Sequence, residues 1–118
     1  MLISEYLDRA ATMLAAEGGW CQGSAAKTAD GQPTAMGSED AKAHCLDGAL
    51  YEVSLTRGIL TGAERYAEYH AARDYLEAHV KSVTNKTLIQ FNDDETQTQA
   101  VVVNFLKKSA EAAKAENK

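Results

Sequence analysis

The stretch from Ser38 to Leu55, SEDAKAHCLDGALYEVSL, carries the strongest structural signal in the chain. Small and apolar residues recur there at helical spacing, which predicts one central helix over the whole stretch. Ser38 is the expected N-cap, because its hydroxyl can accept a hydrogen bond from the first turn. Gly48 inside a helix costs about 1 kcal/mol relative to alanine, so we expect another part of the backbone to pass closely there. The residues of the apolar face are Ala41, Cys45, Leu46, Ala49, Leu50 and Val53.

Three further helices are predicted from the same periodicity and from their end signals. The first runs from about Ser4 to Glu17, with Ser4 as its N-cap and a double glycine as its stop. The next runs from about Gly62 to Val80 and begins with a capping box formed by Thr61 and Glu64. The last runs from about Gln97 to Ala113, where a run of threonine and glutamine that begins at position 96 resembles a second capping box.

The segment from Trp20 to Gly37 does not follow a helical period. Its Asp30-Gly31 pair is typical of a tight turn, which favours a short two-stranded ribbon or an irregular loop. Trp20 is expected to fold back onto the core. In a second connection, Leu88 to Phe91 is too short to separate a strand from an extended loop. The fold class is therefore all-α or mostly α: a compact four-helix domain with a short β-ribbon or loop between its first two helices.

A chain of 118 residues with 45% hydrophobic and 25% charged residues is typical of one globular domain. We expect that domain to span 1–118, with a frayed tail at about 114–118. No run is apolar enough for a membrane span and no signal-peptide pattern begins the chain, so a cytoplasmic location without a membrane partner is expected. The net charge of −5 argues against binding nucleic acid by charge attraction.

The two cysteines, Cys21 and Cys45, are expected to be free thiols in a reducing cytosol. A disulfide between them would require the irregular segment to fold over the central helix. No Cys-x-x-Cys pair occurs, and His44 points away from Cys45 on a helix, so no metal is expected. No glycine-rich phosphate loop is present either, and no cofactor is expected.

Four short motifs follow one another along the chain: Trp20 to Gly23, Asp30 to Pro33, Cys45 to Leu50 and Phe91 to Asp93. Together they resemble a family of small bacterial and bacteriophage proteins, a domain of unknown function, whose members read Trp-x-x-Gly, Asp-x-x-Gly-x-Pro, Cys-x-x-Gly-Ala-Leu and Trp-Asn-Asp. This chain departs from that pattern in a shorter Asp-to-Gly spacing and in Phe91, where the family has tryptophan. The resemblance covers nearly the whole chain and brings no activity. It implies a bacterial or phage setting, which favours a small binding or inhibitory protein.

Cys45 with His44 is the first candidate for chemistry. A catalytic cysteine needs a nearby base or a helix N-terminus to lower its pKa. In the predicted helix Cys45 lies about two turns from the N-terminus, and the base would have to be His70 or His79 from the next helix. The alternative is that Cys45 is a small, inert core residue beside Gly48.

Four aspartates form a second candidate set, because paired carboxylates act as acid and base when their environments separate their pKa values. The alternative is a structural role, since aspartates in turns commonly accept hydrogen bonds from local backbone. A calcium loop is not indicated, because the alternating oxygen ligands and the closing glutamate are missing. These residues are Asp30, Asp47, Asp93 and Asp94.

The third candidate is a surface rich in tyrosine and arginine, on the helix of residues 62–80 and the turn before it. Both residue types are enriched at protein interfaces. The alternative is that the tyrosines are half-buried core residues with their hydroxyl groups in water. The candidate partner-binding residues are Arg57, Arg65, Tyr66, Tyr69, Arg73 and Tyr75.

Two functions remain open. The first is a non-enzymatic binding protein that docks on a protein partner, such as a phage-encoded inhibitor or regulator of a host factor. The second is a small-ligand-binding or Cys-dependent enzymatic domain, with a pocket under the segment from Trp20 to Gly37. A homodimer is the default expectation, because the alanine-rich first helix leaves apolar surface to be covered. The pocket would be formed by Trp20, Asp30, Cys45 and Asn92.

Overall fold

The computed structural model describes all residues from 1 to 118. It contains five helices and a small antiparallel sheet of three strands. The predicted mostly-α class with a ribbon between the first two helices is confirmed, whereas the predicted count of four helices is wrong. The helices are α1 (Ile3–Ala15), α2 (Leu46–Leu55), α3 (Gly62–Thr84), α4 (Leu88–Asp93) and α5 (Gln99–Ala115), and the strands are β1 (Ala26–Lys27), β2 (Pro33–Thr34) and β3 (Ala43–His44).

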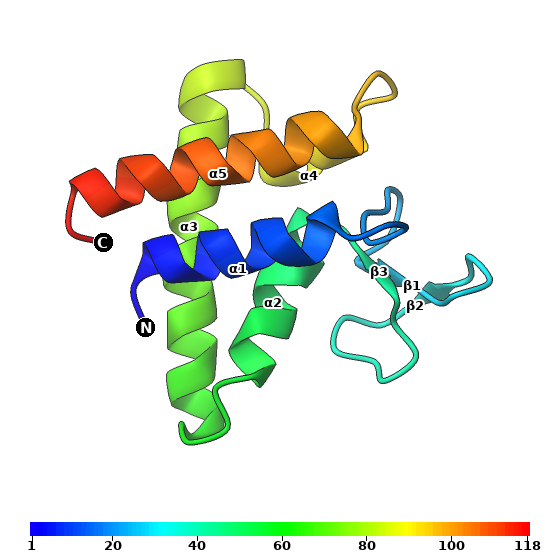
Figure 1. Ribbon diagram of the computed structural model, residues 1–118, viewed down its shortest axis with the longest axis horizontal. Coiled ribbons are helices and arrows are strands. Elements are labelled where there is room, and N and C mark those ends of the chain that lie inside the picture. The colour runs from blue at the N-terminus through cyan, green and yellow to red at the C-terminus, as the bar shows by residue number, and fades with distance from the viewer.

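The core lies where α1, α2, α3 and α5 meet. Figure 1 shows α1 and α5 side by side, running in opposite directions across α3. Leucines from all four helices are fully buried between them: Leu7, Leu14, Leu50, Leu76 and Leu106. Each such side chain contributes roughly 1.5–3 kcal/mol by leaving water. These four helices form the scaffold on which the sheet, α4 and the α2–α3 turn are placed (Figure 1).

Local hydrogen bonds fix the starts of α1 and α3. Ser4, the predicted N-cap of the first helix, lies inside α1 and is buried, so that prediction is wrong. The carboxylate of Glu5 instead accepts a hydrogen bond from the N–H of Leu2 (3.2 Å). The predicted capping box of α3 is confirmed: the N–H of Thr61 donates to Glu64 (2.9 Å) and the N–H of Glu64 donates to Thr61 (3.1 Å).

The start of α2 differs most from the prediction. The helix begins at Leu46 rather than near Ser38, and Cys45 is its N-cap in an extended conformation (φ −80°, ψ 177°). Residues 42–45 join the sheet instead, where the N–H of Cys45 donates to the carbonyl of Ala25 (3.0 Å). Tertiary pairing therefore overrides the helical periodicity of this stretch.

The close backbone approach expected at Gly48 is confirmed. A Cβ atom at this position would lie 2.2 Å from the carbonyl oxygen of Ala25. Only glycine therefore allows the first turn of α2 to pack against the chain that leads into β1.

The sheet has the strand order β2-β1-β3, with both pairs antiparallel. β1 and β2 form the predicted hairpin, closed by a hydrogen bond from the N–H of Thr28 to the carbonyl of Gln32 (2.8 Å). β3 also pairs with the chain just after α1, because the N–H of Cys21 donates to the carbonyl of His44 (3.0 Å). This pairing brings the motif that begins at Trp20 next to the start of α2.

Leu88 to Phe91, which the sequence does not assign to either a strand or a loop, lies in a short helix, α4. Asn85 ends α3 in the left-handed conformation (φ 61°), and Thr87 then begins α4 as its N-cap. The N–H of Gln90 donates to the Thr87 hydroxyl (3.1 Å), and the Thr87 N–H donates to the Gln90 amide (3.0 Å). α5 begins at Gln99 with Thr98 as its N-cap, so the box predicted at position 96 does not form.

The two ends of the chain lie together. The N–H of Ser4 donates to the carbonyl of Lys118 (3.3 Å), and the Lys118 amino group lies 5.5 Å from the centre of the Tyr75 ring. No helix has both the length and the apolar character needed to cross a membrane.

Candidate functional site

Asn92 on α4 is buried and bonds to two segments far from it in sequence. Its Oδ1 atom accepts hydrogen bonds from the indole Nε1–H of Trp20 (2.9 Å) and the N–H of Leu46 (3.0 Å). Its Nδ2 group donates to the carbonyl of Cys21 (3.1 Å) and to Oδ1 of Asp93 (2.9 Å). Three of the four sequence motifs therefore meet at this one amide.

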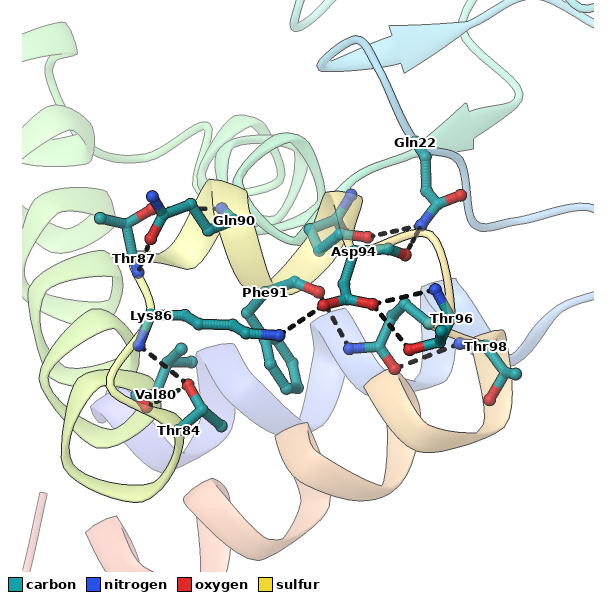
Figure 2. A network of polar contacts seen from close by, with 12 residues as sticks. Gln22, Val80, Thr84, Lys86, Thr87, Gln90, Phe91, Asp94, Thr96 and Thr98 are labelled. Carbon is teal, nitrogen blue, oxygen red and sulfur yellow. Dashed lines mark hydrogen bonds and ion pairs between the residues drawn. The ribbon is translucent and has the colours of Figure 1, made fainter.

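Gln22 and Gly23 extend this contact along the end of α4. The Nε2 group of Gln22 donates to the carbonyls of Asn92 (3.0 Å) and Asp94 (2.8 Å), as Figure 2 shows from close by. The N–H of Gly23 donates to Oδ1 of Asp93 (3.1 Å). Gln22 thus satisfies carbonyls that a helix end leaves without partners.

α4 is also held at both of its ends. Figure 2 shows Lys86, just before the helix, reaching the carboxylate of Asp94, just after it. Oδ1 of Asp94 accepts two more hydrogen bonds, from the N–H (2.9 Å) and the hydroxyl (2.7 Å) of Thr96. The bond from Lys86, followed by those from Thr96, holds the pKa of Asp94 well below its usual range. Asp94 is therefore an ionised structural carboxylate.

Cys45 caps α2 instead of lying inside it, which corrects its predicted position. Its Sγ atom accepts a hydrogen bond from the N–H of Gly48 (3.3 Å). Burial raises the pKa of the Cys45 thiol to about 11 and outweighs that bond, so the thiol is protonated at neutral pH. Cys21 is buried and is also a free thiol.

No histidine is hydrogen-bonded to Cys45. His44 is buried, and burial lowers the pKa of its imidazole, whose Nδ1 atom has no hydrogen-bond partner. Nδ1 of His79 lies 2.6 Å from the hydroxyl of buried Ser109. The ring of His70 packs on Tyr66, with ring centres 4.3 Å apart. The structure does not assemble an activated cysteine with its base.

A pocket of about 230 Å³ lies beside Asn92, between the start of α2, α4 and the loop before β1. Of the predicted pocket residues, Cys45 and Asn92 line it, and Trp20 is bonded to it through Asn92. Asp30 does not line it, because it lies in the β1–β2 turn and bonds to Thr28. The other lining residues include Ser24, Leu46, Asp47, Leu88, Ile89 and Asp93.

Two of the four candidate aspartates, Asp47 and Asp93, line this pocket together. Oδ1 of Asp47 accepts hydrogen bonds from the Tyr69 hydroxyl and from Nε of Arg73 (3.2 Å). Burial, followed by the bond to Asp47, raises the pKa of Tyr69 above its usual range. Tyr69 is only 5% exposed, and both Tyr69 and Arg73 hold the carboxylate of Asp47.

The other predicted partner-binding residues also have partners within the chain. Nε of Arg57 donates to Glu68 (3.1 Å), and a guanidinium N–H of Arg65 donates to the carbonyl of Leu60 (2.7 Å). Tyr75 is half-buried, and burial raises its pKa. Tyr66 alone in this set has an exposed ring, at 59%.

The turn between α2 and α3 belongs to the surface predicted from the sequence, but two exposed apolar side chains in and beside it, Leu55 and Ile59, were not among the predicted residues. Ile59 is 90% exposed, and Leu55 at the end of α2 is also exposed. The sequence does carry a signal for Ile59, because it follows Gly58 in the connection between two helices, and connections run over the surface of a protein. Leu55, Ile59 and Tyr66 are called the turn surface below.

No cluster of three or more His, Cys, Asp or Glu side chains is arranged to hold a metal ion. Comparison with known proteins finds no match among curated proteins or solved structures. Among protein families it finds a match with a family of unknown function, over residues 1–112. The chain therefore belongs to the family described as "Family of unknown function (DUF6197)".

Proposed function

We propose that this protein is a non-enzymatic binding protein that docks on a protein partner through the turn surface. The observation that carries the proposal is Ile59, a large apolar side chain that is 90% exposed. Exposing it costs free energy that burial against a partner recovers, roughly 1.5–3 kcal/mol for a side chain of this size. Tyr66 adds an exposed aromatic ring of the kind that anchors interfaces.

The turn that carries Ile59 is braced from both sides. Arg57 bonds to Glu68 on α3 (3.1 Å), and Arg65 bonds back to the carbonyl of Leu60 (2.7 Å). A braced turn loses little conformational entropy on binding, so more of the contact energy contributes to affinity. In this proposal the two arginines position the turn, and the apolar residues make the contact.

The chemistry of the pocket also favours binding over catalysis. The Cys45 thiol has a raised pKa of about 11 and no histidine partner, whereas a cysteine nucleophile requires a lowered pKa. A cytoplasmic, phage-encoded inhibitor or regulator of a host factor is the form of this function that the resemblance to small bacterial and phage proteins favours.

Affinity purification from cells that naturally make the protein tests the proposal. Tagged wild type is compared with Ile59→Asp and with Val83→Asp, a control at another exposed apolar position on α3 (62% exposed). We expect a co-purified protein that is lost with Ile59→Asp and retained with Val83→Asp, while circular dichroism shows both variants folded. Equal capture by the three proteins, or capture of the same chain alone, would contradict a separate partner at this surface.

A second candidate is the binding of a small ligand in the pocket beside Asn92. The observation that favours it is the pocket itself, which is formed by three segments of the chain. Its walls are largely apolar and include two carboxylates. Native mass spectrometry of the purified protein tests this function: a discrete mass increment supports a retained ligand. The pocket at this size fits a small group and not a drug-sized molecule, which typically requires about 300 Å³ or more.

A further inference from the structure

Several hydrogen-bond donors in the wall of the pocket beside Asn92 are already occupied within the chain. At the start of α2, the N–H of Leu46 bonds to Asn92 (3.0 Å). The Nδ2 group of Asn92 bonds to Cys21 and Asp93, and the N–H of Gly23 also bonds to Asp93 (3.1 Å). The start of α2 therefore offers little to an anionic ligand, although helix N-termini commonly bind anions.

Two carboxylate oxygens of the pocket residues have no hydrogen-bond partner within the chain. The bonds to Asp47 from Tyr69 and Arg73 end on its Oδ1 atom. Those to Asp93 from Gly23 and Asn92 likewise end on Oδ1. Oδ2 of each residue is left as an acceptor, and Asp93 has no ion-pair partner. A ligand that donates hydrogen bonds and carries positive charge would match this arrangement.

The remaining wall of the pocket is apolar. Leu46 and Leu88 are buried beneath it, and Ile89 stands at its rim with 58% of its surface exposed. A bare metal ion would gain nothing from these side chains, and the carboxylates are not clustered with a third ligand. An apolar stem would bury part of Ile89, the exposed apolar side chain of the pocket, while its charged end met the carboxylates.

We propose that the pocket binds a small organic cation, an ammonium or guanidinium group on a short apolar stem. The charged group donates to Asp93 and Asp47, and the stem packs against Ile89. This inference rests on the second candidate function, the binding of a small ligand in this pocket. It applies to a free amine and to a compound that carries the lysine or arginine side chain, since both present the same chemistry.

Trp20 provides the readout, because it is the only tryptophan and its indole N–H bonds to Asn92 in the pocket wall. The native protein is titrated at constant ionic strength with butylammonium, butylguanidinium and N-acetyl-arginine amide. Neutral n-butanol and anionic butyrate serve as matched probes of the stem alone and of the opposite charge. Tryptophan fluorescence and the amide NMR signals of Gly23 and Ile89 are followed together.

Asp93→Asn removes the negative charge of this side chain but keeps an Oδ1 atom that can accept the hydrogen bond from Gly23. Asp8→Asn on α1 is the matched control, since it makes the same change of net charge at an exposed site. We expect saturable shifts with at least one cation and about fivefold weaker binding in Asp93→Asn. Asp8→Asn should bind as wild type does, and butanol and butyrate should bind more weakly than the cation.

Different results would contradict the cation assignment and the binding of any small ligand in this pocket. If butanol or butyrate saturates the same signals as tightly as the cations, or if Asp93→Asn binds cations like Asp8→Asn, the cation assignment is overturned while the pocket remains a ligand site. If no probe shifts the signals of Trp20, Gly23 or Ile89, the inference and the second candidate function both fail.

Discussion

One side chain, Asn92, joins the parts of this protein that the sequence separates. Its amide satisfies the indole of Trp20, the first N–H of α2 and a carbonyl after α1, all within 3.1 Å. An asparagine is suited to this place because its side chain both accepts and donates. Its removal would leave several buried polar groups unpaired at once.

Asn92→Ala should therefore lower the free energy of unfolding by about 2–4 kcal/mol, since each buried group left unpaired costs about 1–3 kcal/mol. The free energy of unfolding is measured by urea denaturation that is monitored with circular dichroism. Asn104→Ala, at an exposed position on α5, is the control and should change stability by less than about 0.5 kcal/mol. Equal stability of the two variants would show that Asn92 does not hold the motifs together.

Gly48 sets a second limit at the residue scale. Gly48→Ala adds a Cβ atom 2.2 Å from the carbonyl oxygen of Ala25, and backbone cannot yield cheaply. We expect a loss of about 1–3 kcal/mol, despite the better helix propensity of alanine. Gly62→Ala on α3, where a Cβ would meet nothing within 4 Å, should be neutral or stabilising in the same denaturation experiment. A stabilising Gly48→Ala would contradict the close approach.

Some of the site could be read from the sequence and some could not. The tight contact at Gly48 was predicted correctly, although Gly48 lies in the first turn of α2 and not in mid-helix. Asp47 and Asp93 were among the candidate carboxylates. The place of Cys45 could not be predicted, because its extended conformation depends on pairing with the carbonyl of Ala25, which no local signal encodes. The hydrogen bond between Trp20 and Asn92 likewise joins residues far apart in sequence, so the periodicity of the sequence does not predict it.

At the scale of elements, the ends of the helices depend on side-chain caps. α4 has only six residues, fewer than an isolated helix needs, so its caps and tertiary contacts must hold it. It begins with the Thr87–Gln90 capping box and ends at the carbonyls bound by Gln22. Because α4 carries Asn92 and one wall of the pocket, its caps also determine the shape of the site.

Thr87→Ala should destabilise the protein by about 1 kcal/mol, the usual cost of losing a threonine N-cap. Thermal or urea denaturation checks the magnitude. Thr12→Ala on α1 is a matched control, because that hydroxyl only bonds back to the carbonyl of Asp8 within its own helix (3.1 Å). The control should be neutral or slightly stabilising, and a Thr87→Ala variant that behaves the same way would refute the role of the cap.

The elements best predicted from sequence are those with local signals. α3 was found from the Thr61–Glu64 box, and α1 and α5 from their apolar periodicity. α4 was missed because its capping threonine and glutamine were not recognised beside a short apolar run that fits a strand as well as a helix. α2 was predicted too long, since residues 38–45 have helical spacing, but residues 38–41 form a turn and residues 42–45 pair with the sheet.

At the scale of the whole molecule, Glu68 on α3 connects the start of the chain, α1 and the α2–α3 turn. Its carboxylate accepts hydrogen bonds from the Met1 amino group (3.2 Å), the Tyr6 hydroxyl (2.8 Å) and Arg57 (3.1 Å). Burial by itself would raise the pKa of Glu68, but the bonds from Arg57, Tyr6 and Met1 outweigh it and lower that pKa to about 2 from an ordinary 4.5. Tyr6 in turn has a raised pKa, because of burial and of this carboxylate.

This lowered pKa predicts acid sensitivity. Between pH 4.5 and 2 the unfolded chain binds a proton at Glu68 that the folded protein does not, so stability falls as the pH falls. The contribution is complete above that range and is lost as the pH approaches 2. Urea midpoints across this range should fall less steeply for Glu68→Gln than for wild type. Glu111→Gln, exposed on α5, should follow the wild-type slope, and a wild-type slope in Glu68→Gln would contradict this role.

The central claim, a protein partner at the turn surface, is tested most directly by photo-crosslinking at single positions. A photoreactive amino acid replaces Ile59 in one protein and Val83 in another, and both are irradiated in cells that naturally make the chain. Position 59 should capture one defined protein that position 83 does not. Labelling at both positions alike, or only of a second copy of this chain at position 59, would contradict the claim.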